Sequence, residues 1–329
     1  MTVINNIEID AIEYKTNNTR EAILNNEPID DVLHVIIVIS NPCQYATRYI
    51  LAKQFIKRLE SYEHVELYVV ELAYGRQNHY ITNSGNPRHL QLRTDSAPLW
   101  HKENMVNIGI CRLLPSQWKA VAWVDADIEF ENCSWALDTL KILNGYKDVV
   151  QLFSHAVDMG KHEETMRVFT SFGYQYENKR QYTTSGLDFW HPGYAWACSR
   201  RAYEKMGGLY QNSILGSGDH NMAYSFMGWG RKSVNNLANA EYLADVLEFQ
   251  KRIGSLRLGY VTGVIKHYYH GSKSDRKYSE RWQILVKHQY NPREHMTLNA
   301  NGLLVPTGSC PIELLADIMN YFRERNEDS

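Results

Sequence analysis

The sequence has 329 residues, of which 44% are hydrophobic and 22% charged, ordinary values for a chain that folds around a core. A chain of this length buries roughly three quarters of its unfolded surface, which excludes a small scaffold held by disulfides. Thirty-five Lys and Arg residues against 37 Asp and Glu residues give a net charge of −2 with no basic segment, which excludes a nucleic-acid binder that works by bulk charge. An anionic ligand must therefore be bound by a few residues at one place.

The longest apolar run, residues 35–39, is far shorter than the ~20 residues of a membrane-spanning helix. The polar N-terminus lacks the apolar segment of a signal peptide, so we expect a cytoplasmic protein without an integral membrane segment. The five cysteines are scattered and form no CxxC pair, which argues against a disulfide framework and against a zinc cluster.

The first predicted elements alternate between strand and helix. After a polar, Asn-rich stretch at 1–31, the β-branched run at 34–40 is typical of a buried parallel strand. A helix is predicted over 47–61 with Thr47 as its N-cap, and a strand over 65–72 completes a βαβ unit. Such units place ligand sites at the carboxyl ends of their strands.

The same alternation resumes after an insert at 73–98 that is predicted to be irregular. We expect a helix over 101–114, a strand over 120–124, a helix over 134–144 and a strand over 148–153. Later elements are a strand over 193–199, a helix that ends at Gly207 and Gly208, helices near 241–253 and 279–288, and an amphipathic helix over 312–325. That last helix packs either on the core or on a partner. With no linker in sight, the pattern predicts a single α/β domain with a mixed, mostly parallel sheet flanked by helices.

The most specific motif is Asp125-Ala126-Asp127, directly after the apolar strand at 120–124. Carboxylates at i and i+2 share one face of an extended chain and can together hold a divalent cation against a diphosphate. Asp residues at a strand end are often merely solvated. Their position at the carboxyl end of a parallel strand favours the metal site here.

Two histidines, His267 and His270, are candidates to complete this site from a distant part of the chain. The Val-Ile before them and Gly271 after them predict a strand that runs into a loop. We therefore expect the two side chains to point in opposite directions and only one to bind metal. The basic residues that follow either neutralise a leaving diphosphate or form a solvated loop; they are Lys273, Arg276, Lys277 and Arg281.

Two further segments carry polar or aromatic candidates. The Gly-rich stretch at 215–221 opens a helix, where Asp219 is either a helix cap or a general base. Around a Pro-Gly bend lie Trp190 and Trp196, of which one is either a platform for a sugar ring or part of the core.

In this order the segments resemble GT-A glycosyltransferases, and most closely the beta-1,4-galactosyltransferase type. The resemblance covers about residues 32–290 and is carried by HKENMVNIG, by the DAD strand end and by MGGLYQNSILGSGDHNMAYSFMGWG. It implies a GT-A (Rossmann-like) fold in which a nucleotide-sugar half and an acceptor half form one domain between two extensions. The expected ranges are 1–31 for an N-terminal elaboration, 32–155 and 156–295 for the two halves of a domain at 32–295, and 296–329 for a C-terminal helical extension.

The resemblance also implies roles for single residues. Asp125 and Asp127 match the metal-binding DxD motif, and His267 matches the metal histidine, with His270 as the alternate. Asp219 matches the loop that supplies the inverting base, although that loop normally carries several consecutive acids. The resemblance places Lys102, Asn107 and Asp125 near the donor nucleotide, and the basic residues Lys273 and Arg276 are expected to bind the donor with them. The residues expected to bind substrate are Trp190, Gly218 and His220.

The sequence therefore predicts a glycosyltransferase that depends on Mn²⁺ or Mg²⁺ and moves a hexose from a nucleotide-diphosphate sugar to a glycan or another hydroxyl acceptor with inversion. A UDP-linked donor is the default that the resemblance implies. Two alternatives stay open. A sugar nucleotidyltransferase normally has a Gly-rich basic loop after its first strand, where this chain has SNPCQYATR. A carbohydrate-binding, transferase-like module would release no nucleotide.

Overall fold

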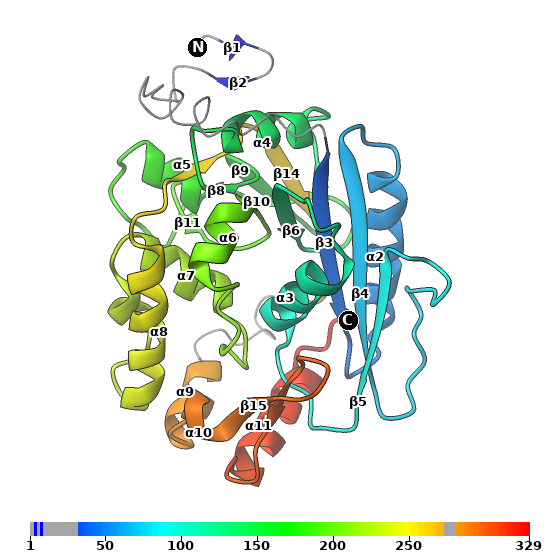
Figure 1. Cartoon of the computed structure of the whole chain (residues 1–329), viewed down its shortest axis with the longest axis vertical. Helices are drawn as coiled ribbons and strands as arrows, with labels where there is room; N and C mark the ends of the chain where they lie inside the picture. Colours follow the sequence, from blue (N-terminus) through cyan, green and yellow to red (C-terminus); the bar gives the residue numbers. More distant parts are fainter. Residues whose placement is uncertain (1–2, 5–6, 9–31, 273–279) are drawn as a thin grey trace.

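The computed structural model describes residues 3–4, 7–8, 32–272 and 280–329. Its centre is a seven-stranded sheet made of β3 (Leu33–Ser40), β4 (Val65–Tyr74), β5 (His89–Thr94), β6 (Ala120–Val124), β8 (Val149–Gln151), β12 (Ala195–Ser199) and β13 (Leu258–Tyr260). The strand order is β13-β8-β12-β6-β3-β4-β5, and β12 alone runs antiparallel to its neighbours (Figure 1). The mixed, mostly parallel sheet expected from the sequence is confirmed.

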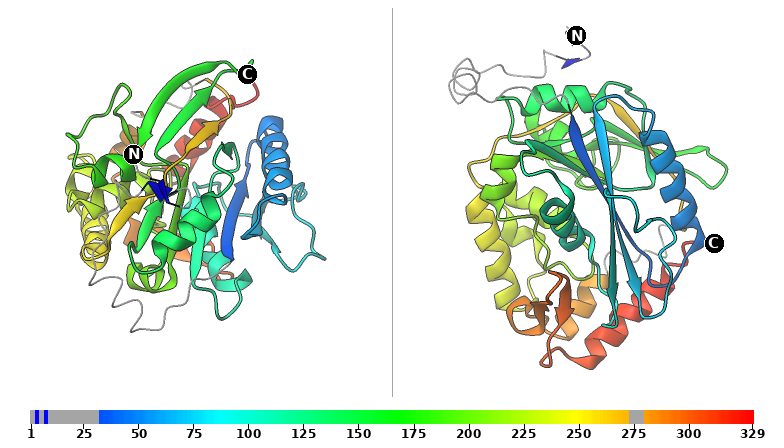
Figure 2. Two further views of the ribbon diagram at one scale, coloured as in Figure 1. Left: turned by 90° about the horizontal axis from the view of Figure 1, so that it is seen from above. Right: turned by 45° about the vertical axis from the view of Figure 1, so that its right-hand side comes forward.

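The helices cover both faces of this sheet. They are α2 (Ala46–Leu59), α3 (Lys102–Leu113), α4 (Trp135–Leu143), α5 (Phe172–Glu177), α6 (Arg200–Met206), α7 (Gly218–Phe226), α8 (Ala240–Ile253), α9 (Glu280–Lys287), α10 (Pro292–His295) and α11 (Ile312–Glu324). In both views of Figure 2, the blue helix α2 and the yellow helix α8 lie at opposite sides of the molecule. None of the helices in the described ranges has the length and apolar character that crossing a membrane requires.

Strand β3 shows how one apolar run serves two cores. Val35 and Ile37 face the core that includes α2 and α4, whereas Ile36 faces the core that includes α3, α6, α8 and α11. Alternate side chains of a strand point to opposite faces, so a strand buried on both faces is apolar throughout. On α11, Leu314 and Ile318 are fully buried in the second of these cores, so this helix packs on the chain's own core.

A second sheet extends one end of the molecule in the order β11-β10-β9-β14-β7. Its strands are β7 (Ile128–Phe130), β9 (His155–Met159), β10 (Thr165–Ser171), β11 (Trp190–His191) and β14 (Val264–His267). The antiparallel pair of β9 and β10 was not among the predicted elements, because neither strand has an uninterrupted apolar run. A small hairpin of β15 (Met296–Leu298) and β16 (Leu304–Pro306) precedes α11.

Two local predictions are wrong. The insert at 73–98 is not irregular throughout, because β5 pairs along the outer edge of β4. Thr47 is not the N-cap of its helix, since α2 begins at Ala46 after Tyr45 and has no cap from a neighbouring side chain. The predicted N-terminal elaboration at 1–31 lies outside the described residues except for β1 (Val3–Ile4) and β2 (Ile7–Glu8).

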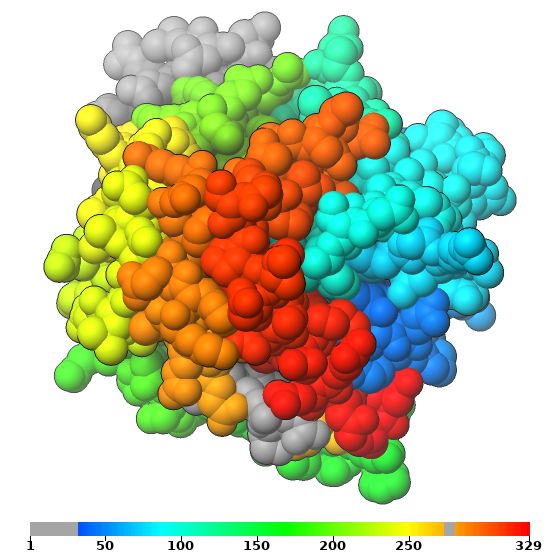
Figure 3. Space-filling view, turned by 90° about the horizontal axis from the view of Figure 1, so that it is seen from below, coloured from blue at the N-terminus to red at the C-terminus, as the bar shows by residue number. Residues whose placement is uncertain are grey.

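The last part of the chain closes the lower face of the molecule. In Figure 3 the orange and red residues, from 280 onward, form a continuous band between the yellow segment and the blue and cyan segments. Residues near the end of the sequence therefore lie beside elements from its first third.

Candidate functional site

Three potential metal ligands meet where β6 ends and β14 ends. The pairing of β14 with β7 sets His267 opposite Ile128, the residue that follows Asp127. The amide of Tyr268 then donates to the carbonyl of Asp127 at 2.8 Å, and the chain turns so that His270 comes back to the same place. The Nε2 atom of His270 lies 3.0 Å from Oδ2 of Asp127 and 3.3 Å from Nε2 of His267.

The expectation that the two histidines point in opposite directions is therefore wrong. It assumed an extended chain from 267 to 270, whereas strand geometry ends at His267. One ligand atom from each of Asp127, His267 and His270 lies within 4.8 Å of the others. This group is called the ligand triad below.

The ligand triad fits one divalent cation. A carboxylate oxygen with two imidazole nitrogens is a donor set that ions such as Mn²⁺ accept. Two ligands about 2.1 Å from an ion and at right angles are about 3.0 Å apart. The separations from Oδ2 of Asp127 are 3.0 Å to His270 and 3.9 Å to His267, in the range that a shared ion requires.

Neighbouring side chains hold His267 in the orientation that the ligand triad needs. Its Nδ1 atom lies 2.9 Å from Oδ1 of Asp158, and Tyr194 stacks on its ring with 4.6 Å between the centroids. The hydroxyl of Tyr194 donates to the same Asp158 oxygen at 3.0 Å. A carboxylate at one ring nitrogen fixes the tautomer and directs the other nitrogen to a metal.

The other carboxylate of the motif, Asp125, has a different partner. Its Oδ1 atom lies 2.5 Å from Nζ of Lys102, and the same ammonium lies 3.9 Å from Oδ2 of Asp219. Burial raises the pKa of Asp125 to about 6, against the opposing effect of Lys102. Burial by itself would lower the pKa of Lys102, but the carboxylates of Asp125 and Asp219 raise it above its ordinary value. Lys102 is therefore a charged link between the two aspartates.

Asp219 lies in the first turn of α7 and does not cap it. The N-cap position is Ser217, which has a left-handed backbone with φ of 78° and no side-chain cap bond. The Asp219 side chain is 24% exposed, and a Cβ on Gly193 would lie 2.9 Å from its Oδ2 atom. Its carboxylate is therefore directed to the cavity beside the Pro-Gly bend.

A cavity of about 650 Å³ connects these groups. Its charged and metal-ligating lining includes Arg48, Lys102, Asp125, Asp127, Asp219, His267, His270, Arg281 and Glu327. Its aromatic lining includes Trp100, Phe169, Tyr182, Phe189, Trp190, His191, Tyr194, His220, Tyr224 and Trp282. The volume lies within the range of small-molecule sites in proteins, about 300 to 1,000 Å³.

The two tryptophans of the Pro-Gly bend are both buried. Trp190 is 5% exposed, packs edge-on against Phe172 and Tyr182, and still lines the cavity. Trp196 is 1% exposed and belongs to the core. The expected exposed platform is therefore a recessed part of the cavity wall.

Two predicted residues lie elsewhere. Asn107 bonds the backbone of Leu209 through both its side-chain atoms, at 2.8 and 3.0 Å, and does not line the cavity. Asn107 follows Lys102 by five positions, and at 100° per residue its side chain lies about 140° around the axis of α3 from that of Lys102. Lys102 does line the cavity. Gly218 packs against Glu103, whose side chain would lie 2.3 Å from an added Cβ.

The basic residues after Gly271 fall into two groups. Lys273, Arg276 and Lys277 lie outside the described residues. Arg281 lines the cavity and donates to the hydroxyl of Ser217 at 2.6 Å.

Four charged residues of the cavity were not predicted from the sequence: Arg48, Arg167, Arg325 and Glu327. Arg48 and Glu327 form a pair. They bind each other across 279 positions of the chain, with 2.7 Å between Nη2 of Arg48 and Oε1 of Glu327. No local pattern signals such a pair, since Arg48 is an ordinary charge in the first turn of α2 and Glu327 an ordinary charge after the end of α11.

No protein-family model matches this sequence, and no curated protein matches it. Among solved structures, a mutant of Drosophila β1,4-galactosyltransferase 7 in complex with manganese, UDP-Gal and xylobiose is 11% identical, with 87% of this chain and 98% of that chain covered and a TM-score of 0.39. Glucosyl-3-phosphoglycerate synthase from Mycobacterium tuberculosis with Mn²⁺, UDP-Glc and phosphoglyceric acid is 10% identical, with 91% and 92% covered and a TM-score of 0.39. A 4-diphosphocytidyl-2C-methyl-D-erythritol synthase from Anaerococcus prevotii is 10% identical, with 71% and 88% covered and a TM-score of 0.30. Because these scores are low, a functional proposal has to rest on the site itself.

Proposed function

We propose that the protein is a metal-dependent glycosyltransferase that moves a sugar from a nucleotide-diphosphate donor to a hydroxyl of a carbohydrate acceptor. The observation that carries this proposal is the ligand triad and Asp219 in one cavity, with Lys102 and Asp125 between them. The cavity thus combines a place for a cation, a carboxylate for proton transfer and an aromatic wall. The resemblance of the sequence adds the donor class, a UDP-linked hexose, and inversion at the sugar carbon.

The ligand triad would hold Mn²⁺ or Mg²⁺ beside the donor diphosphate. A bound ion stabilises the negative charge that develops on the leaving nucleotide as the glycosidic bond breaks. The proposed ligand set differs from the one expected from the sequence: it includes His270 together with His267, and it leaves out Asp125, which forms an ion pair with Lys102. We assign Asp125 and Lys102 to the donor, where an ammonium group and a carboxylate can bind phosphate and sugar hydroxyl groups, respectively.

Asp219 is the proposed general base. The acceptor hydroxyl must lose its proton as its oxygen attacks the sugar carbon, and a carboxylate within hydrogen-bond distance can accept it. Beside Asp219 the cavity wall carries Trp190, His220 and Tyr224, and aromatic rings with a polar edge suit the mixed apolar and polar surface of a sugar. The acceptor is therefore placed between these rings and the donor.

The experiment that tests the proposal measures release of nucleoside diphosphate from a panel of nucleotide sugars with Mn²⁺ and carbohydrate acceptors. We expect release with at least one UDP-sugar and its loss on addition of EDTA. Release of pyrophosphate from a nucleoside triphosphate and a sugar phosphate would instead identify a nucleotidyltransferase. Donor binding without release of any product would identify a binding module.

The base is tested with Asp219→Asn. Transfer should fall by about 10² to 10⁴-fold, the range for loss of a general base, while the donor still raises the melting temperature in the presence of Mn²⁺. Asp317→Asn is the matched control, because Asp317 lies on α11, binds Lys287 and His288, and does not line the cavity. Transfer by Asp219→Asn at the rate of the control would mean that the base lies elsewhere.

A further inference from the structure

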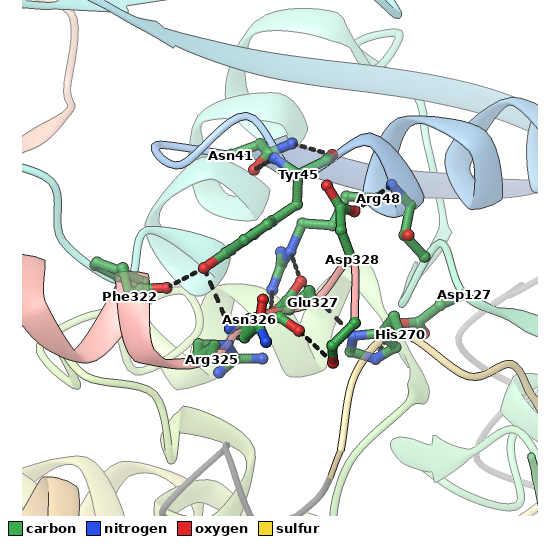
Figure 4. A network of polar contacts seen from close by, with 12 residues as sticks. Asn41, Tyr45, Arg48, Asp127, His270, Phe322, Arg325, Asn326, Glu327 and Asp328 are labelled. Atoms are coloured by element: carbon green, nitrogen blue, oxygen red, sulfur yellow. Dashed lines mark hydrogen bonds and ion pairs between the residues drawn. The ribbon is translucent and has the colours of Figure 1, made fainter. Parts of the chain in front are cut away.

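The segment that follows α11, residues 325–329, enters the wall of the proposed metal site; it is called the tail segment below (Figure 4). Within it, Glu327 is only 1% exposed. Its carboxylate accepts hydrogen bonds from both Nε and Nη2 of Arg48, the latter at 2.7 Å, and from Nε of Arg325 at 2.6 Å. Two guanidinium groups therefore hold this buried carboxylate in one place.

The carboxylate of Glu327 is directed to the ligand triad. Its Oε2 atom lies 3.7 Å from Nδ1 of His270, and the Nε2 atom of the same ring lies 3.0 Å from Asp127. Figure 4 shows His270 between Asp127 and the tail segment. The ring thus has one carboxylate at each nitrogen.

His267 also has a carboxylate at Nδ1, at a shorter distance than the 3.7 Å between His270 and Glu327. Its Nδ1 atom faces the buried carboxylate of Asp158 at 2.9 Å, and its Nε2 atom faces the ligand triad. A carboxylate at Nδ1 keeps the proton on that nitrogen, which leaves the lone pair of Nε2 for a metal. Both histidines of the ligand triad therefore have a buried acidic residue behind them, one from β9 and one from the tail segment.

The tail segment is anchored independently of the Glu327 side chain. Asp328 accepts from the amides of Ala46 and Thr47 at 2.9 and 2.8 Å, and so supplies the cap that α2 lacks locally. The amide of Asn326 donates to the hydroxyl of Tyr45 at 3.2 Å. A Cβ on Gly271 would lie 2.9 Å from the Cα atom of Glu327, so the loop after His270 packs directly on the segment.

We propose that Glu327 is a positioning residue for the metal centre, which orients His270 through its Nδ1 atom. The inference rests on the proposed function for the identity of the ligand triad as a metal site. Arg48 and Arg325 act one step further out, because they hold the carboxylate of Glu327 against the histidine.

The test compares Mn²⁺ binding by the wild type, Glu327→Gln and Asp328→Asn, measured by titration calorimetry without nucleotide. Glu327→Gln keeps the shape of the side chain and removes its charge, and its Mn²⁺ affinity should fall by about 10 to 100-fold, the usual effect of losing such a partner. Asp328→Asn is the matched control from the same segment. It weakens the cap of α2 but does not touch His270, so it should lower the melting temperature and leave the affinity within twofold of the wild type.

A second measurement needs only the wild type. Nitrogen-15 NMR of the protein saturated with Mg²⁺, a diamagnetic ion, should show the proton of His270 on Nδ1, which faces Glu327, with Nε2 left for the ion; a merely structural role of Glu327 would not require this. A proton on Nε2 would overturn the inference, as would equal Mn²⁺ affinities in Glu327→Gln and the wild type while the wild type still binds Mn²⁺. A wild type that binds no Mn²⁺ would instead overturn the metal site of the proposed function, and the role of Glu327 with it.

Discussion

The two aspartates of the Asp125-Ala126-Asp127 motif have different partners, so we predict that they contribute unequally to metal binding. Asp127 carries the only negative charge of the ligand triad. Asp125 forms an ion pair with Lys102 at 2.5 Å, which cancels most of its field at a distance. Asp127→Asn should therefore weaken Mn²⁺ binding far more than Asp125→Asn does.

The size of the difference follows from the geometry. Two unit charges 4 Å apart at the surface of a protein interact by about 4 kcal/mol, and a carboxylate that binds the ion directly lies closer than that. Even after the cost of desolvation, Asp127→Asn should lose more than about 2.7 kcal/mol, which is a 100-fold loss of affinity. Asp125 faces the ion as part of an ion pair with Lys102 and not as a single charge. For Asp125→Asn we therefore expect a loss of binding free energy below about 1.4 kcal/mol, which is less than a tenfold loss of affinity.

Titration calorimetry with Mn²⁺ in the absence of nucleotide measures both affinities, and circular dichroism checks that both variants fold. Nucleotide must be absent because Asp125 is assigned to the donor, and a ternary complex would mix the two effects. Equal losses in the two variants, or a larger loss in Asp125→Asn, would refute the assignment of Asp127 to the ion and of Asp125 to Lys102.

Two further predictions concern stability. Asp148 accepts from the Arg257 backbone and guanidinium at 2.8 to 2.9 Å; burial alone would raise its pKa, but Arg257 holds that pKa below its ordinary value. The pair therefore stabilises the fold above a pH of about 3.9, the unfolded pKa of Asp148, and this contribution is lost as the pH falls through the lower folded pKa. Arg257→Ala leaves the backbone amide and Arg201, at 3.5 Å, as partners of Asp148. It should therefore lower the free energy of unfolding in urea by about 1.5 to 3 kcal/mol at pH 7 and by clearly less at pH 3. A cost that does not depend on pH would contradict this. In α3, a Cβ on Gly109 would lie 2.9 Å from Val70, so Gly109→Ala should lower the melting temperature, since overpacking of about 1 to 3 kcal/mol outweighs the ~1 kcal/mol gained in helix propensity. A higher melting temperature would show that Val70 can move enough to accommodate the added methyl group.

The sheet and one part of the site follow from local patterns in the sequence. The run at 34–40 reads as a buried strand because both of its faces are apolar, and the structure places β3 there. Asp125 and Asp127 lie at the end of β6, where a parallel strand presents polar groups to a ligand. Both results depend only on residues that are adjacent in the chain.

The remainder of the site depends on contacts that no local pattern encodes. His270 points toward Asp127 because the chain turns after His267, where the amide of Tyr268 donates to the carbonyl of Asp127, more than a hundred positions away. The side on which Asn107 lies depends on how α3 is rotated about its own axis relative to the sheet, and a motif match carries no information on that rotation. Glu327 reaches the cavity only because α11 packs on the core and directs the following residues to α2.

The cap of α2 has a consequence for the order in which the chain becomes structured. The acceptor for the amides of Ala46 and Thr47 comes from Asp328, 282 and 281 positions later. During synthesis on the ribosome, α2 is complete long before this acceptor exists, and closing so long a loop is slow. The first turn of α2 and the surroundings of His270 therefore gain these contacts only after α11, which directs the tail segment to α2, has packed on the core.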